Sequence, residues 1–338
     1  MRPIGAAVVG LGRIGRVHAE IIATKLSGAR LVAVSDVIES FAREVGEKLK
    51  VKWYTDYDKL LKDPEVDAVF ITTPTYLHGE MIVKAAESGK HVFTEKPITV
   101  TKPEAVEAVR AARKAGVKLM VGYMRRFDDA YSEAKRRIEQ GAIGRPLVFV
   151  NVARDPAPPP GWAADPKLSG GIFLDMLSHD FDMARFLIAS DVKSVYVLGG
   201  AMLYDEIRQK GDLDVVTVNF EFESGAFGML HGSRKSVFGY DLRTEVMGTE
   251  GTVYVGSQVD PNLAVGSKEG LVYRGVQWFW ARFYEAYVRE DQAFVDSIVN
   301  DREPPITGVD GLRVVEIAEA CWQSWREKRP VAVEKTPV

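Results

Sequence analysis

The stretch Leu174–Asp182, L-D-M-L-S-H-D-F-D, places a histidine and three aspartates among apolar residues. Asp175 and His179 are four residues apart, so on a helix they would share one face. An imidazole can move a proton near neutral pH because its ordinary pKa is about 6.5, and a nearby carboxylate favours its protonated form. The pair is therefore a candidate general base with an aspartate partner. The alternative is an Asp–His pair with no chemical role on a half-exposed helix face.

The side chains of the two aspartates after His179 would point to different faces of the helix. Asp182 would lie on the same face one helical turn further on, so it stays a candidate site residue. Asp180 would point away from the pair, and we expect it at the surface or between domains. Arg185 is placed to pair with either of them.

A second charged pair, Glu95 and Lys96, lies in H-V-F-T-E-K-P-I-T directly after an apolar run. A lysine at the carboxyl end of a strand can bind a substrate hydroxyl and stabilise the alkoxide that develops as hydride leaves. From spacing alone, a surface Glu–Lys pair is an equal alternative.

The segment V-V-G-L-G-R-I-G, residues 8–15, contains G-x-G-x-x-G as Gly10, Gly12 and Gly15. It follows an apolar strand and opens a helix, which is the context that dinucleotide binding requires. Such glycines allow a tight turn and the close approach of a pyrophosphate, which the backbone amides and the helix dipole then bind. We expect the intervening Arg13 and Ile14 to contact the cofactor as well. A glycine-rich turn without a ligand is the alternative.

Asp36 ends the second apolar run, A-V-S-D, roughly 20 residues after the glycine loop, the distance expected of a carboxylate that binds adenosine ribose hydroxyls. It would repel a 2′-phosphate, and the next arginine in the chain is Arg43. These features favour NAD over NADP. Asp36 could also cap the following helix, which is compatible with the first role.

The loop Ile71–His78, I-T-T-P-T-Y-L-H, follows another strand. Ligands bind at the carboxyl edge of a doubly wound sheet, where several strand ends meet. Residues near that edge are therefore expected to line the cofactor site; they are Thr72, Thr73, Pro74, Glu95 and Lys96. His78 either joins them or serves only to cap and pack.

These loops require a scaffold that brings strand ends together. Over the first 120 or so residues, short apolar runs alternate with helical segments, which is typical of a doubly wound parallel sheet. The expected strands are Ile4–Val9, Ala29–Ser35, Val66–Thr72, His91–Thr94 and Lys118–Gly122.

After residue 122 the pattern changes. A helix over Gly170–Leu187 carries the Asp–His pair, and helices over Phe283–Val299 and Gly311–Lys328 close the chain. Before and between these helices lie β-like stretches separated by turn signals, which predict an α/β domain with a mostly antiparallel sheet. They are Leu147–Ala153, Ser194–Leu198, Val215–Phe222, Gly225–Gly232, Thr244–Met247 and Thr252–Val255. The aromatic run Val276–Tyr287 fits core packing or a subunit contact better than a sugar-stacking surface.

We therefore expect an α/β protein with an NAD-binding Rossmann domain over residues 1–122. A second α/β domain over residues 123–305 would bind substrate and build oligomers. Residues 306–338 would form a C-terminal helix and a tail that packs back near the domain junction.

Composition excludes several other classes. The 338 residues carry a net charge of −3, which gives no basic footprint for nucleic acid. The N-terminal apolar run is too short for a signal segment or a membrane span. Cys321 is the one cysteine, so no internal disulfide can form, and no Cys/His cluster has metal-binding spacing. We expect a cytoplasmic protein without a metal.

As a set, the motifs resemble those of the Gfo/Idh/MocA family of nicotinamide-dependent oxidoreductases. The shared segments occur in family order and spacing, at residues 10–15, 73–78, 95–97, 122–128 and 169–182. The chain is most similar to the inositol 2-dehydrogenases of that family, through M-R-R-F-D, the D-x-x-x-H helix and F-G-Y-D at 238–241.

The resemblance implies a second domain with an open sheet whose free face builds dimers and tetramers. It implies that Lys96 is the family lysine, before a Pro97 whose peptide bond is often cis, and that His179 is the general base paired with Asp175. It also implies residues close to the nicotinamide or the polyol, namely Met124, Arg125, Asp155 and Tyr240. Met176 departs from the small polar residue found after the aspartate in some relatives, which bears on the substrate.

The implied activity is NAD-dependent oxidation of a cyclitol, myo-inositol to 2-keto-myo-inositol, by a cytoplasmic homotetramer of inositol catabolism. Lys96 would polarise the hydroxyl and His179 would accept its proton, while Asp175 would bind substrate or orient the site. Scyllo-inositol or a pyranose sugar is an alternative substrate. A dinucleotide-binding sensor without turnover is the alternative from another class.

Overall fold

The computed structural model describes residues 2–256, 259–268, 270–275 and 279–338. The chain forms two compact units: Met1–Met124 with Tyr287–Val315 and Thr336–Val338, and Arg125–Ala286 with Glu316–Lys335. The sequence-based boundary assigned residues 123–305 to the second domain. In the structure the chain from Tyr287 packs with the first unit, because Phe294 lies against Phe70 and Phe93 of its sheet.

The first unit is built on a parallel sheet of strand order β3-β2-β1-β4-β5-β6. The strands are β1 (Ile4–Val9), β2 (Ala29–Ser35), β3 (Lys52–Tyr54), β4 (Ala68–Ile71), β5 (His91–Glu95) and β6 (Leu119–Gly122). The predicted doubly wound sheet is confirmed. The edge strand β3 was not predicted, because three mostly exposed residues leave no apolar pattern.

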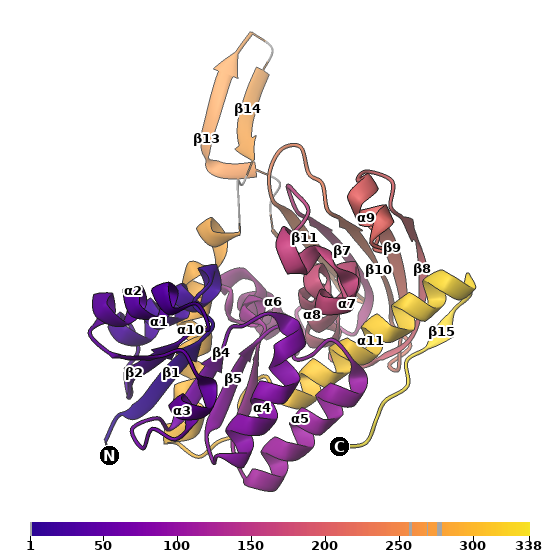
Figure 1. Cartoon of the computed structure of the whole chain (residues 1–338). Coiled ribbons are helices and arrows are strands. Elements are labelled where there is room, and N and C mark those ends of the chain that lie inside the picture. The colour runs from indigo at the N-terminus through magenta and orange to yellow at the C-terminus, as the bar shows by residue number, and fades with distance from the viewer. Residues whose placement is uncertain (1, 257–258, 269, 276–278) are drawn as a thin grey trace. The chain divides into compact units, whose positions relative to one another are not determined.

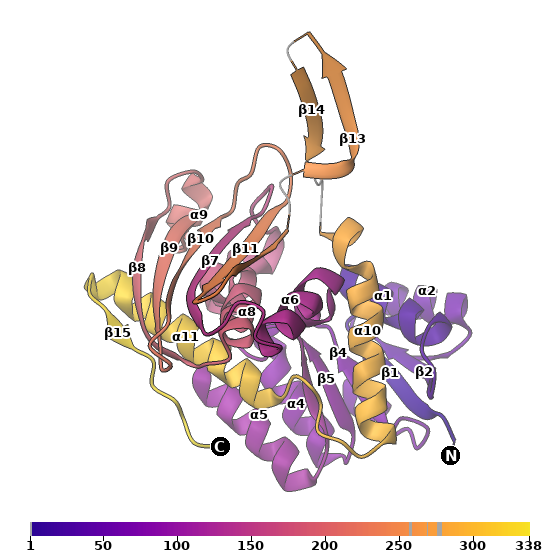
Figure 2. The same ribbon diagram turned by 180° about the vertical axis from the view of Figure 1, so that it is seen from behind.

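Helices cover both faces of this sheet (Figure 1). Right-handed crossovers place α1 (Arg13–Thr24) and α2 (Glu39–Leu49) on one face, and α4 (His78–Glu87) and α5 (Lys102–Ala115) on the other. The short α3 (Tyr57–Leu61) and the 3₁₀ turn η1 (Thr75–Leu77) complete the connections. On the α1 face, α10 (Trp280–Val299) lies over the central strands (Figure 2).

The second unit contains a seven-stranded sheet of order β12-β11-β7-β10-β9-β8-β15, in which only β7 and β10 pair in parallel. The predicted mostly antiparallel sheet is confirmed. Its strands are β7 (Pro146–Arg154), β8 (Val192–Gly200), β9 (Val215–Phe222), β10 (Phe227–Ser233), β11 (Asp241–Gly248), β12 (Thr252–Val255) and β15 (Val331–Ala332). A separate hairpin, β13 (Val259–Ser267) with β14 (Gly270–Gly275), was not predicted.

One face of this sheet is covered by helices, with Phe181 of α8 (Ser178–Ile188) packed edge-on against Phe220 at 6.1 Å between ring centroids. The indole of Trp325 in α11 (Gly308–Glu327) donates to the carbonyl oxygen of Gly199 at 2.9 Å. The remaining elements are η2 (Met124–Phe127), α6 (Asp129–Glu139), η3 (Gly161–Ala164), α7 (Pro166–Ser169) and α9 (Asp205–Gln209).

The single helix predicted over Gly170–Leu187 is wrong. Gly170 and Gly171 have φ of 79° and 66°, in the left-handed region that ends a helix. A π-helical turn, η4 (Ile172–Met176), follows them and α8 begins only at Ser178. Asp175 and His179 therefore lie on two consecutive helical segments.

Of the aromatic run Val276–Tyr287, residues 276–278 lie outside the described part of the chain. Phe283 and Tyr287 are buried, which fits core packing, and Tyr284 is exposed.

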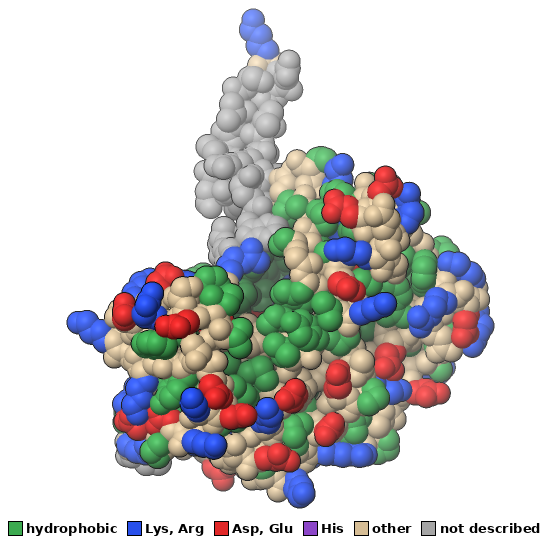
Figure 3. All heavy atoms as spheres, viewed as in Figure 1, with side chains coloured by type: hydrophobic (Ala, Val, Ile, Leu, Met, Phe, Trp, Pro, Cys, Tyr) green, Lys and Arg blue, Asp and Glu red, His purple; other side chains and the backbone are tan. Residues whose placement is uncertain are grey.

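No helix in the described ranges is both long and apolar enough to cross a bilayer. Figure 3 shows Lys and Arg side chains interspersed with Asp and Glu over α4 and α5.

Candidate active site

The three glycines of the first loop are required for different reasons. Gly10 has φ 89°, and a Cβ there would lie 2.8 Å from the backbone nitrogen of Thr73. A Cβ on Gly15 would lie 1.8 Å from the carbonyl oxygen of Gly10. By contrast, a Cβ on Gly12 would meet no atom within 4 Å. The fold itself needs Gly10 and Gly15, whereas Gly12 leaves space that a bound group can approach.

The start of α1 faces that space with its positive dipole end. The helix is preceded by Gly12, which has no side-chain cap, and its first turn contains no acidic residue. The Thr72 hydroxyl, at the end of β4, donates to the carbonyl oxygen of Gly10 at 2.6 Å and so stabilises the conformation of the loop. Free space beside a helix N-terminus suits a pyrophosphate.

Asp36 is bound to the same loop. Its Oδ2 accepts from the Leu11 amide at 2.6 Å and its Oδ1 accepts from the Ile38 amide at 2.8 Å. Each oxygen keeps a further lone pair, which ribose hydroxyls could fill. The residue that caps α2 is Ile38, so Asp36 is not that helix's N-cap.

The guanidinium of Arg16 lies close to this loop, but a carboxylate engages it. Its two terminal nitrogens donate to Glu44 at 2.7 and 2.8 Å, and its Nε donates to the carbonyl oxygen of Leu11 at 3.1 Å. The group also lies over the ring of Phe41. A paired arginine beside an acidic Asp36 fits NAD better than a cofactor with a 2′-phosphate.

His78 joins the two loops that follow β4 and β5. Its Nδ1 lies 2.9 Å from the Pro97 oxygen and its Nε2 lies 2.8 Å from the Thr73 oxygen, and burial lowers the pKa of the imidazole. Of the two roles considered, these contacts are those of a packing residue. The Lys96–Pro97 peptide bond is cis, as the resemblance implied.

Sequence reasoning missed a buried ion cluster behind this edge. His18 of α1 lies between Asp291 of α10 and Glu95 of β5, and all three side chains are buried. Burial alone would lower the pKa of His18, but the two carboxylates outweigh it and raise the pKa to about 10. No local pattern joins these positions, which are far apart in the sequence.

In the second unit, Asp175 is held by an arginine that the sequence did not single out. Arg234 Nη1 donates to Asp175 Oδ2 at 2.9 Å, and its Nη2 donates to Asp212 Oδ2 at 3.1 Å. Asp212 also accepts from the Ile172 amide at the start of η4. Burial raises the pKa of Asp212 despite the opposing effect of Arg234. The orientation of Asp175 therefore depends on a fully buried guanidinium.

Asp155 lies near the same arginine because of the parallel pairing of β7 with β10. Both strands end in register at Arg154 and Ser233, and the Asp155 amide donates to the Ser233 oxygen at 2.9 Å. Asp155 and Arg234 are thus the first residues after two adjacent strands that end side by side.

Asp180 was expected at the surface or between the domains, and the surface alternative is wrong. Its Oδ1 accepts from Arg125 at 2.6 Å and from the Asn151 amide group at 2.8 Å, and the carboxylate is fully buried. Arg125 also donates to the Tyr240 hydroxyl at 3.0 Å. Nearly every residue of α8 is buried, so a side chain such as Asp180 that points away from the Asp175–His179 pair still lies in the interior.

Asp182 and Arg185 have other partners. Asp182 is buried and accepts two hydrogen bonds from Arg126, at 2.5 and 2.8 Å. Arg185 pairs with Asp191. His179, Met176 and Met124 are buried within their own units.

The structure therefore assembles the predicted residues in two groups. In the first unit, the glycine loop, Asp36, Thr72 and the loop of Lys96 lie along one sheet edge. In the second unit, Asp175 belongs to the cluster around Arg234, and Arg125 with Tyr240 belongs to the cluster around Asp180. The sequence contained a signal for Arg234, which is its position near a predicted strand end. It comes two residues after the β-like stretch Gly225–Gly232.

Comparison with known proteins identifies the family to which both parts of the chain belong. Residues 4–123 match the model of an oxidoreductase family with an NAD-binding Rossmann fold, and residues 131–254 match the GFO/IDH/MocA C-terminal domain. The chain belongs to the Gfo/Idh/MocA oxidoreductase family. Its first unit is the NAD-binding Rossmann domain of that family, and the open space at Gly12 agrees with that cofactor.

Family members of similar sequence align over nearly the whole chain. A scyllo-inositol 2-dehydrogenase (NAD⁺) from Bacillus subtilis is 40% identical, over 98% of this chain and 96% of its own length. A myo-inositol 2-dehydrogenase from Thermotoga maritima is 38% identical, over 97% and 98%. The structure of scyllo-inositol dehydrogenase from Lactobacillus casei with bound NAD(H) and scyllo-inositol superposes with a TM-score of 0.91. It is 33% identical and covers 98% of this chain and 99% of its own.

Proposed function

We propose that this chain is an NAD-dependent cyclitol dehydrogenase that oxidises myo-inositol at C2 to 2-keto-myo-inositol, in the direction of inositol catabolism. The observation that carries the proposal is its near full-length similarity to inositol 2-dehydrogenases, one of them solved with NAD(H) and a cyclitol. The glycine loop with its open space at Gly12, and Asp36 beside it, would hold the cofactor. NAD, when bound, supplies the hydride acceptor.

In this proposal, the chain's own residues handle the hydroxyl proton. His179 accepts it as general base, because an imidazole matches the proton affinity needed near neutral pH. Lys96 donates a hydrogen bond to the same hydroxyl oxygen and stabilises its developing negative charge. Asp175 binds substrate or orients the site, and its ion pair with buried Arg234 keeps the carboxylate in one position. Met124, Arg125, Asp155 and Tyr240 are the proposed substrate contacts.

Scyllo-inositol is the second candidate substrate. It is favoured by the 40% identity with the scyllo-inositol enzyme from Bacillus subtilis. Myo- and scyllo-inositol differ only in the configuration of one hydroxyl, so a few contacts decide between them. Met176 directly follows Asp175, at a position where some relatives have a small polar residue, and it is the side chain that we expect to influence this choice.

The test is a substrate panel followed at 340 nm, with myo-inositol, scyllo-inositol and D-glucose, each with NAD and with NADP. The proposal expects the highest kcat/KM with myo-inositol and NAD. A higher value with scyllo-inositol would favour the second candidate, and turnover of glucose alone would make the chain a sugar dehydrogenase. NAD binding by calorimetry with no NADH formed from any substrate would favour a non-catalytic sensor.

The chemical roles have their own test. Lys96→Ala and His179→Gln should each lower kcat by at least about 100-fold, the usual contribution of a positioned acid–base group. NAD affinity should change by less than about threefold, since neither group is part of the glycine loop. An unchanged kcat in either variant would remove that residue from the mechanism.

We further propose that the free face of the seven-stranded sheet builds a homotetramer in the cytoplasm. On this face Phe227, Val148 and Met247 are paired neighbours on three adjacent strands, and Met229 and Tyr254 lie in the next row. Except for half-buried Val148, these apolar side chains are exposed in the single chain. Phe227→Glu should lower the mass measured by light scattering, whereas Met202→Glu, in the exposed loop after β8, should not. Equal masses would argue against this face.

A further inference from the structure

A buried ion cluster connects three elements of the Rossmann unit. His18 lies on α1, the helix that the glycine loop opens, and its Nδ1 is 2.9 Å from both carboxylate oxygens of Asp291 on α10. Its Nε2 is 3.1 Å from Oε1 of Glu95. His18 and Asp291 are fully buried, and Glu95 is 8% exposed.

The imidazole in this cluster must donate from both nitrogens. Ionised carboxylates only accept hydrogen bonds, so an imidazole between two of them donates from both N–H groups. Aromatic rings enclose the imidazole and exclude water: Phe93 at 5.3 Å, Tyr287 at 5.7 Å and Phe70 at 6.1 Å between centroids. This burial by itself disfavours the charged ring, so the charge depends on the two carboxylates that pair with it. A charged histidine paired on both sides fixes the direction of each carboxylate.

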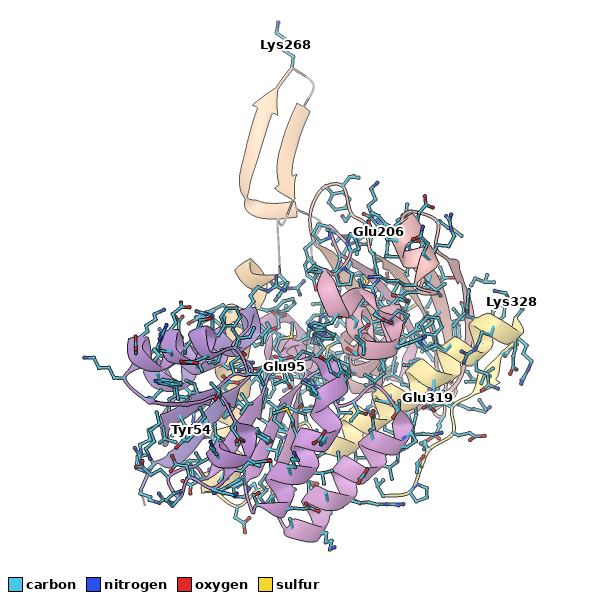
Figure 4. All side chains as sticks on the ribbon, viewed as in Figure 1. Tyr54, Glu95, Glu206, Lys268, Glu319 and Lys328 are labelled. Carbon is cyan, nitrogen blue, oxygen red and sulfur yellow. The ribbon has the colours of Figure 1, made fainter. Side chains whose placement is uncertain are left out.

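Glu95 transmits this constraint to the adjacent lysine. While Oε1 faces His18, Oε2 accepts a hydrogen bond from the backbone amide of Lys96 at 3.0 Å. Glu95 is the last residue of β5, at the carboxyl edge of the sheet (Figure 4). The carboxylate therefore spans from the core to the backbone of the loop. A further bond on the other side of the loop, from His78 to Pro97, holds the cis turn in place.

We propose that His18 is a positioning residue for Lys96: its ring, anchored by Asp291, orients Glu95, which holds the backbone from which Lys96 reaches the substrate hydroxyl. This inference rests on the proposed role of Lys96. It assigns a function to the histidine that follows the glycine loop and to an aspartate on a C-terminal helix. Neither residue needs to touch substrate or cofactor.

The first test is His18→Gln in the full-length protein. A carboxamide can donate to only one of the two carboxylates and turns its oxygen towards the other, so Glu95 loses its fixed direction. We expect kcat to fall on the order of tenfold or more, as for a small misplacement of a reacting group, with Kd for NAD within about threefold. Asp63→Asn is the matched control. Asp63 is also buried in this unit and ion-paired, but it bonds Lys52 and Tyr54 at the β3 edge.

Asp291 provides a second test that leaves α1 untouched and serves if His18→Gln fails to fold. Asp291→Asn can donate to Nδ1 while a neutral ring donates from Nε2 to Glu95, so both bonds persist and kcat should stay within about twofold. Asp291→Ala removes the anchor and should lower kcat as His18→Gln does. A conservative variant that rescues kcat separates positioning from general stability. Equal kcat for Asp291→Asn and Asp291→Ala would overturn the inference.

A double-mutant cycle completes the experiment. If His18 acts through Glu95, His18→Gln should cost little more in a Glu95→Gln background, whereas independent effects add. Additive losses, or the same loss of kcat in Asp63→Asn, would overturn the proposal. Lys96→Ala distinguishes the two levels: wild-type kcat in that variant refutes the proposed role of Lys96 and this inference with it, while the substrate panel tests the proposed function itself. An inactive Lys96→Ala with unchanged His18→Gln and Asp291→Ala refutes the inference alone.

Discussion

Arg125 donates a hydrogen bond to Asp180 across 2.6 Å, and the two side chains form an ion pair inside the second unit. Breaking one side of a buried ion pair leaves an uncompensated charge. Asp180→Asn should therefore lower the free energy of unfolding by about 3–5 kcal/mol. It should also raise KM for the cyclitol, since Arg125 binds the Tyr240 hydroxyl.

Urea denaturation and steady-state kinetics measure these two effects. The control is Asp205→Asn, which removes an exposed carboxylate that pairs with Arg208 within α9. It should change the free energy of unfolding by less than about 0.5 kcal/mol. Equal changes in the free energy of unfolding in the two variants would show that the Asp180 ion pair stabilises the fold no more than an exposed pair does.

The glycine loop offers a contrast between folding and binding. Gly12→Ala adds a methyl group where no protein atom lies within 4 Å, so the melting temperature should stay near that of wild type. The methyl group occupies the space for the pyrophosphate, so Kd for NAD should rise about tenfold or more. Gly15→Ala collides with the Gly10 carbonyl oxygen and should lower the melting temperature. Thermal melts with isothermal calorimetry test both; a Gly12→Ala protein with wild-type NAD affinity would contradict the cofactor site.

Asp36 should determine the choice between NAD and NADP. Asp36→Asn removes the charge that repels a 2′-phosphate but keeps an oxygen for the Leu11 amide. The ratio of kcat/KM for NAD to that for NADP should fall by about tenfold, or roughly 1.4 kcal/mol of discrimination. Glu39→Gln, on the exposed first turn of α2, is the control and should leave the ratio unchanged. A constant ratio in Asp36→Asn would reassign the selectivity to another residue.

The His18 cluster predicts how stability varies with pH. Burial opposes the charge, but Asp291 and Glu95 raise the folded-state pKa of His18 from 6.5 to about 10. Because the folded-state pKa of His18 is above its ordinary value, the charged ring makes its full contribution to the free energy of unfolding below pH 6.5. That contribution is lost as the pH rises towards 10. The difference in unfolding free energy between wild type and His18→Gln should shrink between pH 7 and 10, by up to about 1.4 kcal/mol per pH unit.

Chemical denaturation at several pH values measures this difference. Asp291, Glu95 and Tyr287 are the titratable groups that face the His18 ring. Asp63→Asn, whose partners lie at the β3 edge, provides a reference for the pH response of the rest of the unit. A difference between wild type and His18→Gln that stays constant with pH would mean that His18 is neutral in the fold.

Local sequence was sufficient for the features that depend on neighbouring residues. All strands of the parallel sheet except β3 appear as short apolar runs, and the glycine loop is recognisable because its function requires small residues at fixed spacing between a strand and a helix. Asp36 and Lys96 follow from the same logic, since the carboxyl ends of parallel strands meet at one edge. The π-turn before α8 was missed because helical periodicity does not distinguish a broken helix from a continuous one.

Only the tertiary structure decided which charged residues pair in the interior. His18 with Asp291, Arg125 with Asp180 and Arg234 with Asp175 join positions that are far apart in the chain. The sequence by itself determined the kind of protein, an NAD-binding α/β oxidoreductase, because motif spacing and strand periodicity are local properties. The partners of its buried charges depend on how sheets and helices pack, because a charge removed from water must find its counterion in space and not along the sequence.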